Sequence, residues 1–194
     1  MNLFTSRRLF KTRLVIISAV LFVGLLFIVR GIAISRQASP LSITQKVRNL
    51  SAQETDWQIA TTAVPGDVLE YFALVQLPRD YAKTIKDISL AADLDSNFSY
   101  RGQTLSSFAL GINNANSDNF AKKLLSNSGL EVKQLKSGEF IDIKWQSRLA
   151  ENISFGDKVL PLLGNRLLVK AKNFNNREAE TIVSINSTQE RILG

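Results

Sequence analysis

Three oxygen-bearing side chains at alternate positions are the best candidates for binding a metal. Asp93, Asp95 and Asn97 could present oxygen ligands to Ca²⁺, which prefers carboxylate and amide oxygens. An EF-hand loop starting at Asp93 would need glycine where Phe98 stands and glutamate where Thr104 stands, so that motif is absent. Two interpretations remain, a looser calcium site between strands and a solvated strand end. Calcium is the only cofactor that the sequence suggests.

Neighbouring acidic residues form a second set of candidates, because glycoside hydrolysis uses two carboxylates. The chain has 17 acidic residues, and a β domain carries most of its acids on outward strand positions and in turns, so no pair stands out. We therefore predict that the protein is not an enzyme, and keep a membrane-tethered carbohydrate-active enzyme as a rival hypothesis. The candidate pairs are Asp93 with Asp95, Glu139 with Asp142, and Glu178 with Glu180.

The composition excludes several other chemistries. The chain contains no Cys and no His. Zinc sites of the Cys/His kind, cysteine nucleophiles, haem ligation and the Ser-His-Asp triad each lack a required residue. Neither Gly-x-Ser-x-Gly nor Ser-x-x-Lys occurs, which removes two common settings for a nucleophilic serine.

Basic residues are concentrated at the N-terminus. The formal charge is +7, but six of the 24 basic residues precede residue 37, where there is no acid, so the remaining 18 nearly balance the 17 acids. A domain that binds nucleic acid needs a strongly basic face to displace counterions. No nucleic-acid partner is therefore expected.

An apolar segment over residues 14–34 follows a basic N-terminus over residues 1–13. As a helix rising about 1.5 Å per residue, the segment would reach roughly 31 Å, which is enough to cross a bilayer core. The basic residues before it place the N-terminus in the cytoplasm by the positive-inside rule. The sequence thus predicts a single-pass signal anchor in the cell membrane, with the lipid bilayer as its partner and residues 46–194 outside the cytoplasm.

Two alternatives compete with the anchor. A signal peptide could be cleaved after Ser35, with Ala33 and Ser35 as the small residues at the cleavage site. The segment Ser6–Lys11 also resembles a twin-arginine export signal. An uncleaved anchor is preferred because the apolar run is long for a signal peptide and Arg30 lies close to that cleavage site.

The exposed part consists of a predicted linker over residues 35–45 and one domain over residues 46–194. Several short alternating segments are separated by turn signals, and no strand-helix-strand alternation occurs. This pattern is typical of a mainly β protein, an immunoglobulin-like antiparallel β-sandwich. The predicted strands are residues 67–75, 85–92, 140–149, 165–173 and 179–185.

Within the sandwich, one short helix is predicted between Asn116 and Gly129, because capping residues flank apolar residues at helical spacing. Trp145 shares the apolar face of its strand and is assigned to the core, whereas Trp57 is open to either interpretation. In the strand over residues 67–75 both faces carry apolar side chains, which predicts a strand that is covered on both sides.

Four segments stand in the order and spacing of a known family: Lys46–Ser51, Val64–Val75, Asp87–Gly102 and Lys136–Leu149. Together they resemble the cell-surface conserved repeat called domain of unknown function eleven, which begins with a Pro-Gly-Asp turn and a Glu-Tyr strand. The resemblance implies an immunoglobulin-like module of bacterial or archaeal envelope proteins that is structural or adhesive and not catalytic. The chain departs from the family at Leu77, Asp95 and Ser137, and by the inserted helix.

The sequence therefore predicts a membrane-anchored envelope protein that displays one immunoglobulin-like module and meets other envelope or surface proteins. The main alternative is a subunit of a surface filament, in which the N-terminal helix would pack in the filament core. Against that alternative, pilins usually carry an acidic residue early in the apolar helix, whereas the first acid of this chain is Glu54.

Overall fold

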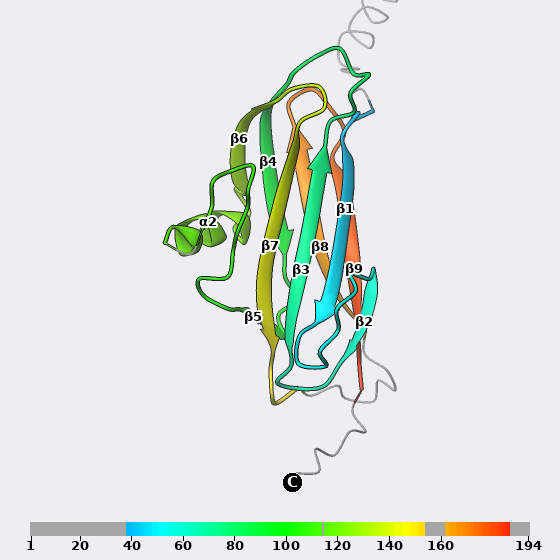
Figure 1. Cartoon of the computed structure of the whole chain (residues 1–194), viewed down its shortest axis with the longest axis vertical. Coiled ribbons are helices and arrows are strands. Elements are labelled where there is room, and N and C mark those ends of the chain that lie inside the picture. The colour runs from blue at the N-terminus through cyan, green and yellow to red at the C-terminus, as the bar shows by residue number, and fades with distance from the viewer. Residues whose placement is uncertain (1–37, 114, 154–161, 187–194) are drawn as a thin grey trace, which may run out of the picture. The chain divides into compact units, whose positions relative to one another are not determined.

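The computed structural model describes residues 38–113, 115–153 and 162–186. These residues fall in one compact unit, in which two β-sheets pack face to face (Figure 1). In this part of the chain, no helix combines the length and hydropathy that crossing a bilayer requires. The predicted basic N-terminus (1–13) and membrane span (14–34) lie outside the described residues.

The first sheet, called the front sheet here, has four antiparallel strands in the order β1-β3-β7-β5. It faces the viewer in Figure 1. Its long strands alternate between buried and more exposed residues, as period-two patterning requires. The strands are β1 (Ser42–Asn49), β3 (Val68–Gln76), β5 (Phe98–Tyr100) and β7 (Phe140–Leu149).

The second sheet, called the back sheet, has five strands in the order β2-β9-β8-β4-β6. It corrects the prediction of a purely antiparallel sandwich, because β2 runs parallel to β9. β2 ends at Ala63, just before the turn that starts β3, and the Asn186 backbone N–H after β9 donates a 2.9 Å hydrogen bond to the Ala63 carbonyl. Both strands therefore end at the same end of the sandwich. The strands are β2 (Ala60–Ala63), β4 (Ile85–Asp93), β6 (Leu130–Leu135), β8 (Leu162–Ala171) and β9 (Arg177–Ile185).

The apolar core fills the space between the sheets and confirms the inward positions read from the sequence. Ile141, Ile143 and Trp145 of β7 are buried, as are Leu69, Tyr71, Ala73 and Val75 of β3. The Trp145 ring stacks on Tyr71 with centroids 5.3 Å apart. Trp145 is therefore a core residue, as predicted.

Polar side chains also join the two sheets inside the core. The Asn165 amide of the back sheet donates a hydrogen bond to the Tyr71 phenol of the front sheet. The Gln45 amide of β1 donates to the Asn165 carbonyl at 3.2 Å and to the Thr181 hydroxyl at 3.3 Å. Burial raises the pKa of the Tyr71 phenol, because the charged phenolate would be poorly solvated there.

The start of the domain corrects the predicted linker over residues 35–45. β1 begins at Ser42 and includes the last four residues assigned to the linker. Before it, Ser39 and Leu41 are buried, and the Arg177 guanidinium donates a 2.9 Å hydrogen bond to the Ser39 carbonyl. The sequence pattern did not predict this strand, because the inward-facing Gln45 interrupts the alternation of apolar residues.

The turn before β3 makes contacts that hold the fold together. Gly66 has a φ of +88°, which glycine adopts without strain. The buried Asp67 carboxylate accepts hydrogen bonds from the Val64 backbone N–H at 2.9 Å and from the Asn49 amide at 2.8 Å. The Asp67 side chain therefore fixes the turn backbone.

The predicted helix is present as α2 (Ser117–Leu124). It buries Ala121 and Leu124 and lies beside β4 and β6 at one edge of the sandwich (Figure 1). The chain leaves the helix through Gly129, with a φ of +75°, where an added Cβ would stand 2.8 Å from the Leu90 carbonyl oxygen. Glycine is therefore required where this loop lies against β4.

Candidate functional site

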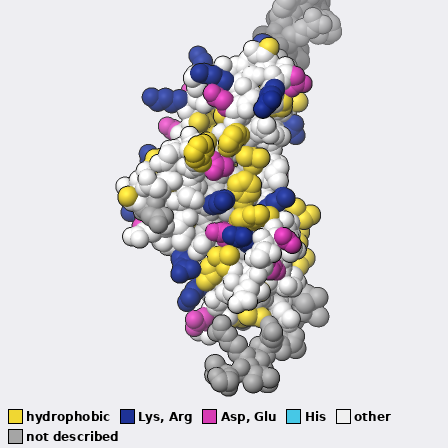
Figure 2. Space-filling view, in the orientation of Figure 1, with side chains coloured by type: hydrophobic (Ala, Val, Ile, Leu, Met, Phe, Trp, Pro, Cys, Tyr) yellow, Lys and Arg dark blue, Asp and Glu magenta, His cyan; other side chains and the backbone are white. Residues whose placement is uncertain are grey.

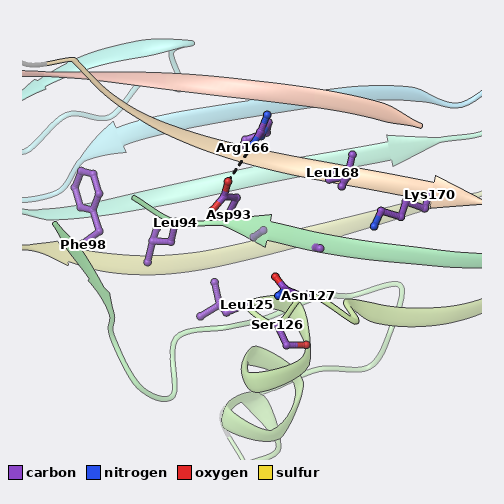
Figure 3. A pocket seen from close by; sticks show the side chains of 11 residues that line it. Asp93, Leu94, Phe98, Leu125, Ser126, Asn127, Arg166, Leu168 and Lys170 are labelled. Carbon is purple, nitrogen blue, oxygen red and sulfur yellow. Dashed lines mark hydrogen bonds and ion pairs between the residues drawn. The ribbon is translucent and has the colours of Figure 1, made fainter. Parts of the chain in front are cut away.

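The structure places the three predicted calcium ligands in two different environments. Asp93 ends β4 and its carboxylate accepts a hydrogen bond from Arg166 at 3.1 Å (Figure 3). Asp95 instead accepts hydrogen bonds from the backbone N–H and the side-chain amide of Asn97, each at 2.9 Å. The Asn97 nitrogen, and not its oxygen, faces Asp95. Within the described ranges no cluster of three acids suits a metal ion, and calcium binding here stays a prediction.

Arg166 is the centre of an exposed charge network on the outer side of the back sheet. Its guanidinium contacts Asp93 and also lies 3.6 Å from the Glu178 carboxylate. The hydrogen bond to Asp93, and then the charge of Glu178, raise the pKa of Arg166. These contacts hold the carboxylates in ion pairs at the surface.

A cavity of about 500 Å³ adjoins this network, between the back sheet and the end of α2 (Figure 3). Ala91 and Leu168 line it from the strands, and Leu125 lines it from the end of the helix. Asp93 is the one carboxylate among its described lining residues, and it is paired with Arg166. The described lining residues thus include no second acid of the kind that two-carboxylate glycoside hydrolysis uses.

The other candidate acid pairs also make structural contacts. The Glu139 carboxylate accepts a 2.7 Å hydrogen bond from the Lys136 backbone N–H. Asp142 accepts hydrogen bonds from two consecutive backbone N–H groups, as described below. Glu178 pairs with Arg166, and the Glu180 side chain lies against Gly164. These acids hold turns and strands in place.

The outward side of β3 corrects the prediction that this strand is covered on both sides. Phe72 and Leu74 are only half-buried and face solvent on the front sheet. The Trp57 ring lies beside Phe72, with centroids 5.6 Å apart. Arg48 lies 4.6 Å above the Trp57 ring, and the Lys144 ammonium lies 5.8 Å from the Phe72 ring. Cations at these distances are attracted by the ring faces.

The exposed apolar surface continues onto a neighbouring loop. Phe140 is 44% exposed, and Phe108 is 89% exposed. The Asp142 carboxylate accepts hydrogen bonds from the backbone N–H groups of Phe108 at 3.1 Å and Ala109 at 2.9 Å, so the loop is held in one position. A hollow of about 430 Å³ beside Phe108 is lined by Phe140 and Leu110.

Together these side chains form the aromatic stripe, defined as Trp57, Phe72, Leu74, Phe108 and Phe140. Strand pairing sets Leu74 opposite Asp142, which holds the Phe108 loop. Phe108 and Phe140 line one hollow together with residues of β6, so the stripe extends from the front sheet toward the β6 edge of the sandwich. Figure 2 shows apolar side chains interleaved with basic ones on this side of the molecule.

The front face carries an excess of positive charge around the stripe. Arg48 is paired with Glu70 at 2.6 Å. Lys46, Lys144 and Arg148 also face outward, and among the described residues none of these three is within ion-pair distance of a carboxylate. The front face thus combines aromatic rings with three cations that no described carboxylate neutralises.

Several solved structures resemble the chain. They include the major pilin subunit BcpA of Bacillus cereus (15% identity, covering 75% of this chain and 40% of that chain, TM-score 0.45). They also include the N-terminal domain of the Streptococcus gordonii adhesin Sgo0707 (12%, 74% and 32%, TM-score 0.45). A family 123 glycoside hydrolase from Clostridium perfringens follows at 9% identity (76% and 27%, TM-score 0.38).

The chain spans less than half the length of each of these three structures. All three TM-scores are below 0.5, so these likenesses carry no argument about the role of this chain. No family model matches the chain, and no curated protein matches it. Membership of the cell-surface conserved repeat family is therefore not confirmed.

Proposed function

We propose that this protein is a non-catalytic envelope protein that displays one immunoglobulin-like sandwich at the cell surface and binds other proteins through its front face. The observation that carries the proposal is the aromatic stripe. Phe108 and Phe140 are exposed, and Trp57, Phe72 and Leu74 are partly exposed. A folded domain rarely leaves such a group of large apolar side chains open to solvent unless they contact a partner.

The composition of the stripe favours a protein as its partner. Aromatic residues and arginine are enriched at the energetic centres of protein interfaces. Arg48 and Lys144 already lie over the Trp57 and Phe72 rings, so these ring faces are less free to stack on a sugar. Phe108 stands on a loop that Asp142 holds in place, so little conformational entropy would be lost when it binds.

The position of the module follows from the sequence. Residues 14–34 anchor the chain in the cell membrane with residues 1–13 in the cytoplasm, and the sandwich stands outside. The module is of the kind found in the cell-surface conserved repeat family. Catalysis is not part of the proposal, since the candidate carboxylates are engaged in ion pairs and turn contacts.

Site-specific photo-cross-linking in whole cells tests this function. A photoreactive phenylalanine analogue replaces Phe108 in the full chain, and a matched variant carries it at Lys122, which is exposed on α2 away from the front face. We expect protein adducts from position 108 and few from position 122. Equal labelling at both positions, or no protein adduct at position 108, would overturn the proposal.

A further inference from the structure

The most exposed apolar side chains divide between the two sheets. Phe108 and Phe140 belong to the front face. Leu162, 64% exposed, and Ile182, 42% exposed, point outward from the back sheet, and Ile59, 71% exposed, lies at the edge of that sheet. The sandwich therefore has an apolar surface on both sides.

The residues Ile59, Leu162 and Ile182, called the back patch, lie together. Ile182 is directly opposite Gly164 across the β8–β9 pair, and Leu162 is two residues away on the same side of β8. The Ile182 backbone N–H donates a 3.1 Å hydrogen bond to the Ile59 carbonyl. The space over Gly164 is filled by the Glu180 side chain, which places a carboxylate next to the two aliphatic side chains.

The charges beside the back patch are opposite to those of the front face. Asp93 contacts Arg166, Glu178 lies 3.6 Å from the same guanidinium, and Glu180 is directly opposite Arg166 in the strand pairing. Three carboxylates thus face two cations, Arg166 and the exposed Lys170 further along β8, which leaves the region with a small excess of negative charge. The front face, in contrast, is positive through Lys46, Lys144 and Arg148.

We propose that the front face of one copy of this chain binds the back face of the next copy, with the aromatic stripe against the back patch. This inference rests on the proposed function and names the partner of the same face. Contact between two front faces would oppose lysines to lysines, and contact between two back faces would oppose carboxylates to carboxylates. Front-to-back contact pairs opposite charges on both sides of an apolar centre.

Such a contact is heterologous, because different surfaces of the two copies meet. A heterologous contact leaves a free front face and a free back face at the ends, so it adds further copies in a row unless the rotation closes a ring. The row would be built by the sandwiches themselves. It differs from a filament whose core is made of packed N-terminal helices.

The size of the front face predicts a weak contact. β3 has nine residues, which extend about 30 Å, and three strands at a spacing of about 4.8 Å give a footprint of roughly 430 Å² per copy. A total near 900 Å² is the size of transient interfaces. Copies anchored side by side in one membrane would have a high effective concentration, which compensates for weak affinity.

Cysteine cross-linking of the full chain in mild detergent tests the inference directly, because the chain contains no Cys. Thr44→Cys places one thiol on the outward side of β1, and Thr62→Cys places one beside the back patch; both threonines are exposed. Lys122→Cys on α2 is the control. Each variant is treated with a flexible bismaleimide alone and in equal mixtures.

We expect covalent dimers chiefly in the mixture of Thr44→Cys with Thr62→Cys, several-fold above either variant alone and above mixtures with Lys122→Cys. Dimers from Thr44→Cys alone would show front-to-front contact and overturn the inference. A mixture no better than the control would also overturn it. If position 108 then cross-links in cells to a different protein, the proposed function stands while the self-association fails.

Discussion

The outward faces of the two sheets enclose the same core but expose different chemistry. On the front face, Phe72 and Leu74 project from β3 toward solvent and cations lie over the neighbouring rings. On the back face, small residues such as Ala91 and Gly164 alternate with ion-paired side chains around Arg166. The difference shows that period-two patterning identifies a strand, whereas the residues on its outward side indicate whether that side has a partner.

The largest effect on stability is expected for a core residue that supports both sheets. Trp145 is buried and stacks on Tyr71, so Trp145→Ala should lower the free energy of unfolding by about 3–5 kcal/mol. Urea unfolding of the full chain measures this change. A loss below about 1 kcal/mol would contradict the assignment of this residue to a shared core.

The second effect tests the polar contacts that join the faces through the core. The neutral Tyr71 phenol is favoured in the folded protein because its pKa is raised by burial. The stabilisation of the folded protein that results is complete below the unfolded pKa of about 10. It is lost as the pH rises toward the folded pKa, by about 1.4 kcal/mol per pH unit. Between pH 8 and pH 11 the wild type should therefore lose about 1.4 kcal/mol more stability than Tyr71→Phe. Equal losses would show that the phenol is not protected by burial.

The third effect separates the faces by charge. Reversing Lys46 and Lys144 together to glutamate should reduce front-to-back cross-linking about tenfold, because the acidic back face would then be repelled. Reversing Lys83 and Lys122, which are exposed outside the front sheet, is the matched control and should leave cross-linking unchanged. An equal decrease of cross-linking in both variants would mean that the association depends on the net charge of the protein and not on the charges of the front face.

The smallest effect on stability is expected at the most exposed residue of the stripe. Phe108 is 89% exposed, so Phe108→Ala should change the free energy of unfolding by no more than about 0.5 kcal/mol. The same variant should reduce cross-linking between front and back. If Phe108→Ala were strongly destabilising, the loop would be part of the fold and its role as a binding residue would be in doubt.

Sequence patterning predicted the elements whose alternation is clean. The strand at Phe140–Leu149 alternates Ile141, Ile143 and Trp145 with Asp142, Lys144 and Gln146, and its bounds were predicted as observed. β1 was missed because the inward-facing Gln45 bonds to the back sheet, a contact that a local pattern does not contain. β2 is only four residues long, too short for a period to appear.

The candidate face was only partly visible in the sequence. The apolar residues on the second side of β3 were recognised, but they were assigned to a covering layer because local sequence does not reveal what lies above a strand. Phe108 follows no period, and its exposure depends on Asp142, 34 residues away, which fixes the loop. The excess of cations around the stripe arises only when β1, β3 and β7 are brought side by side.

The central claim is that the front and back faces bind each other through opposite charges. Its most direct test mixes two full-length variants, one with Lys46 and Lys144 reversed to glutamate and one with Glu178 and Glu180 reversed to lysine. Each variant alone opposes like charges and should not self-associate in light scattering of concentrated samples. The equal mixture restores opposite charges at every contact and should recover the association of the wild type. A mixture that associates no better than either variant alone would contradict the claim.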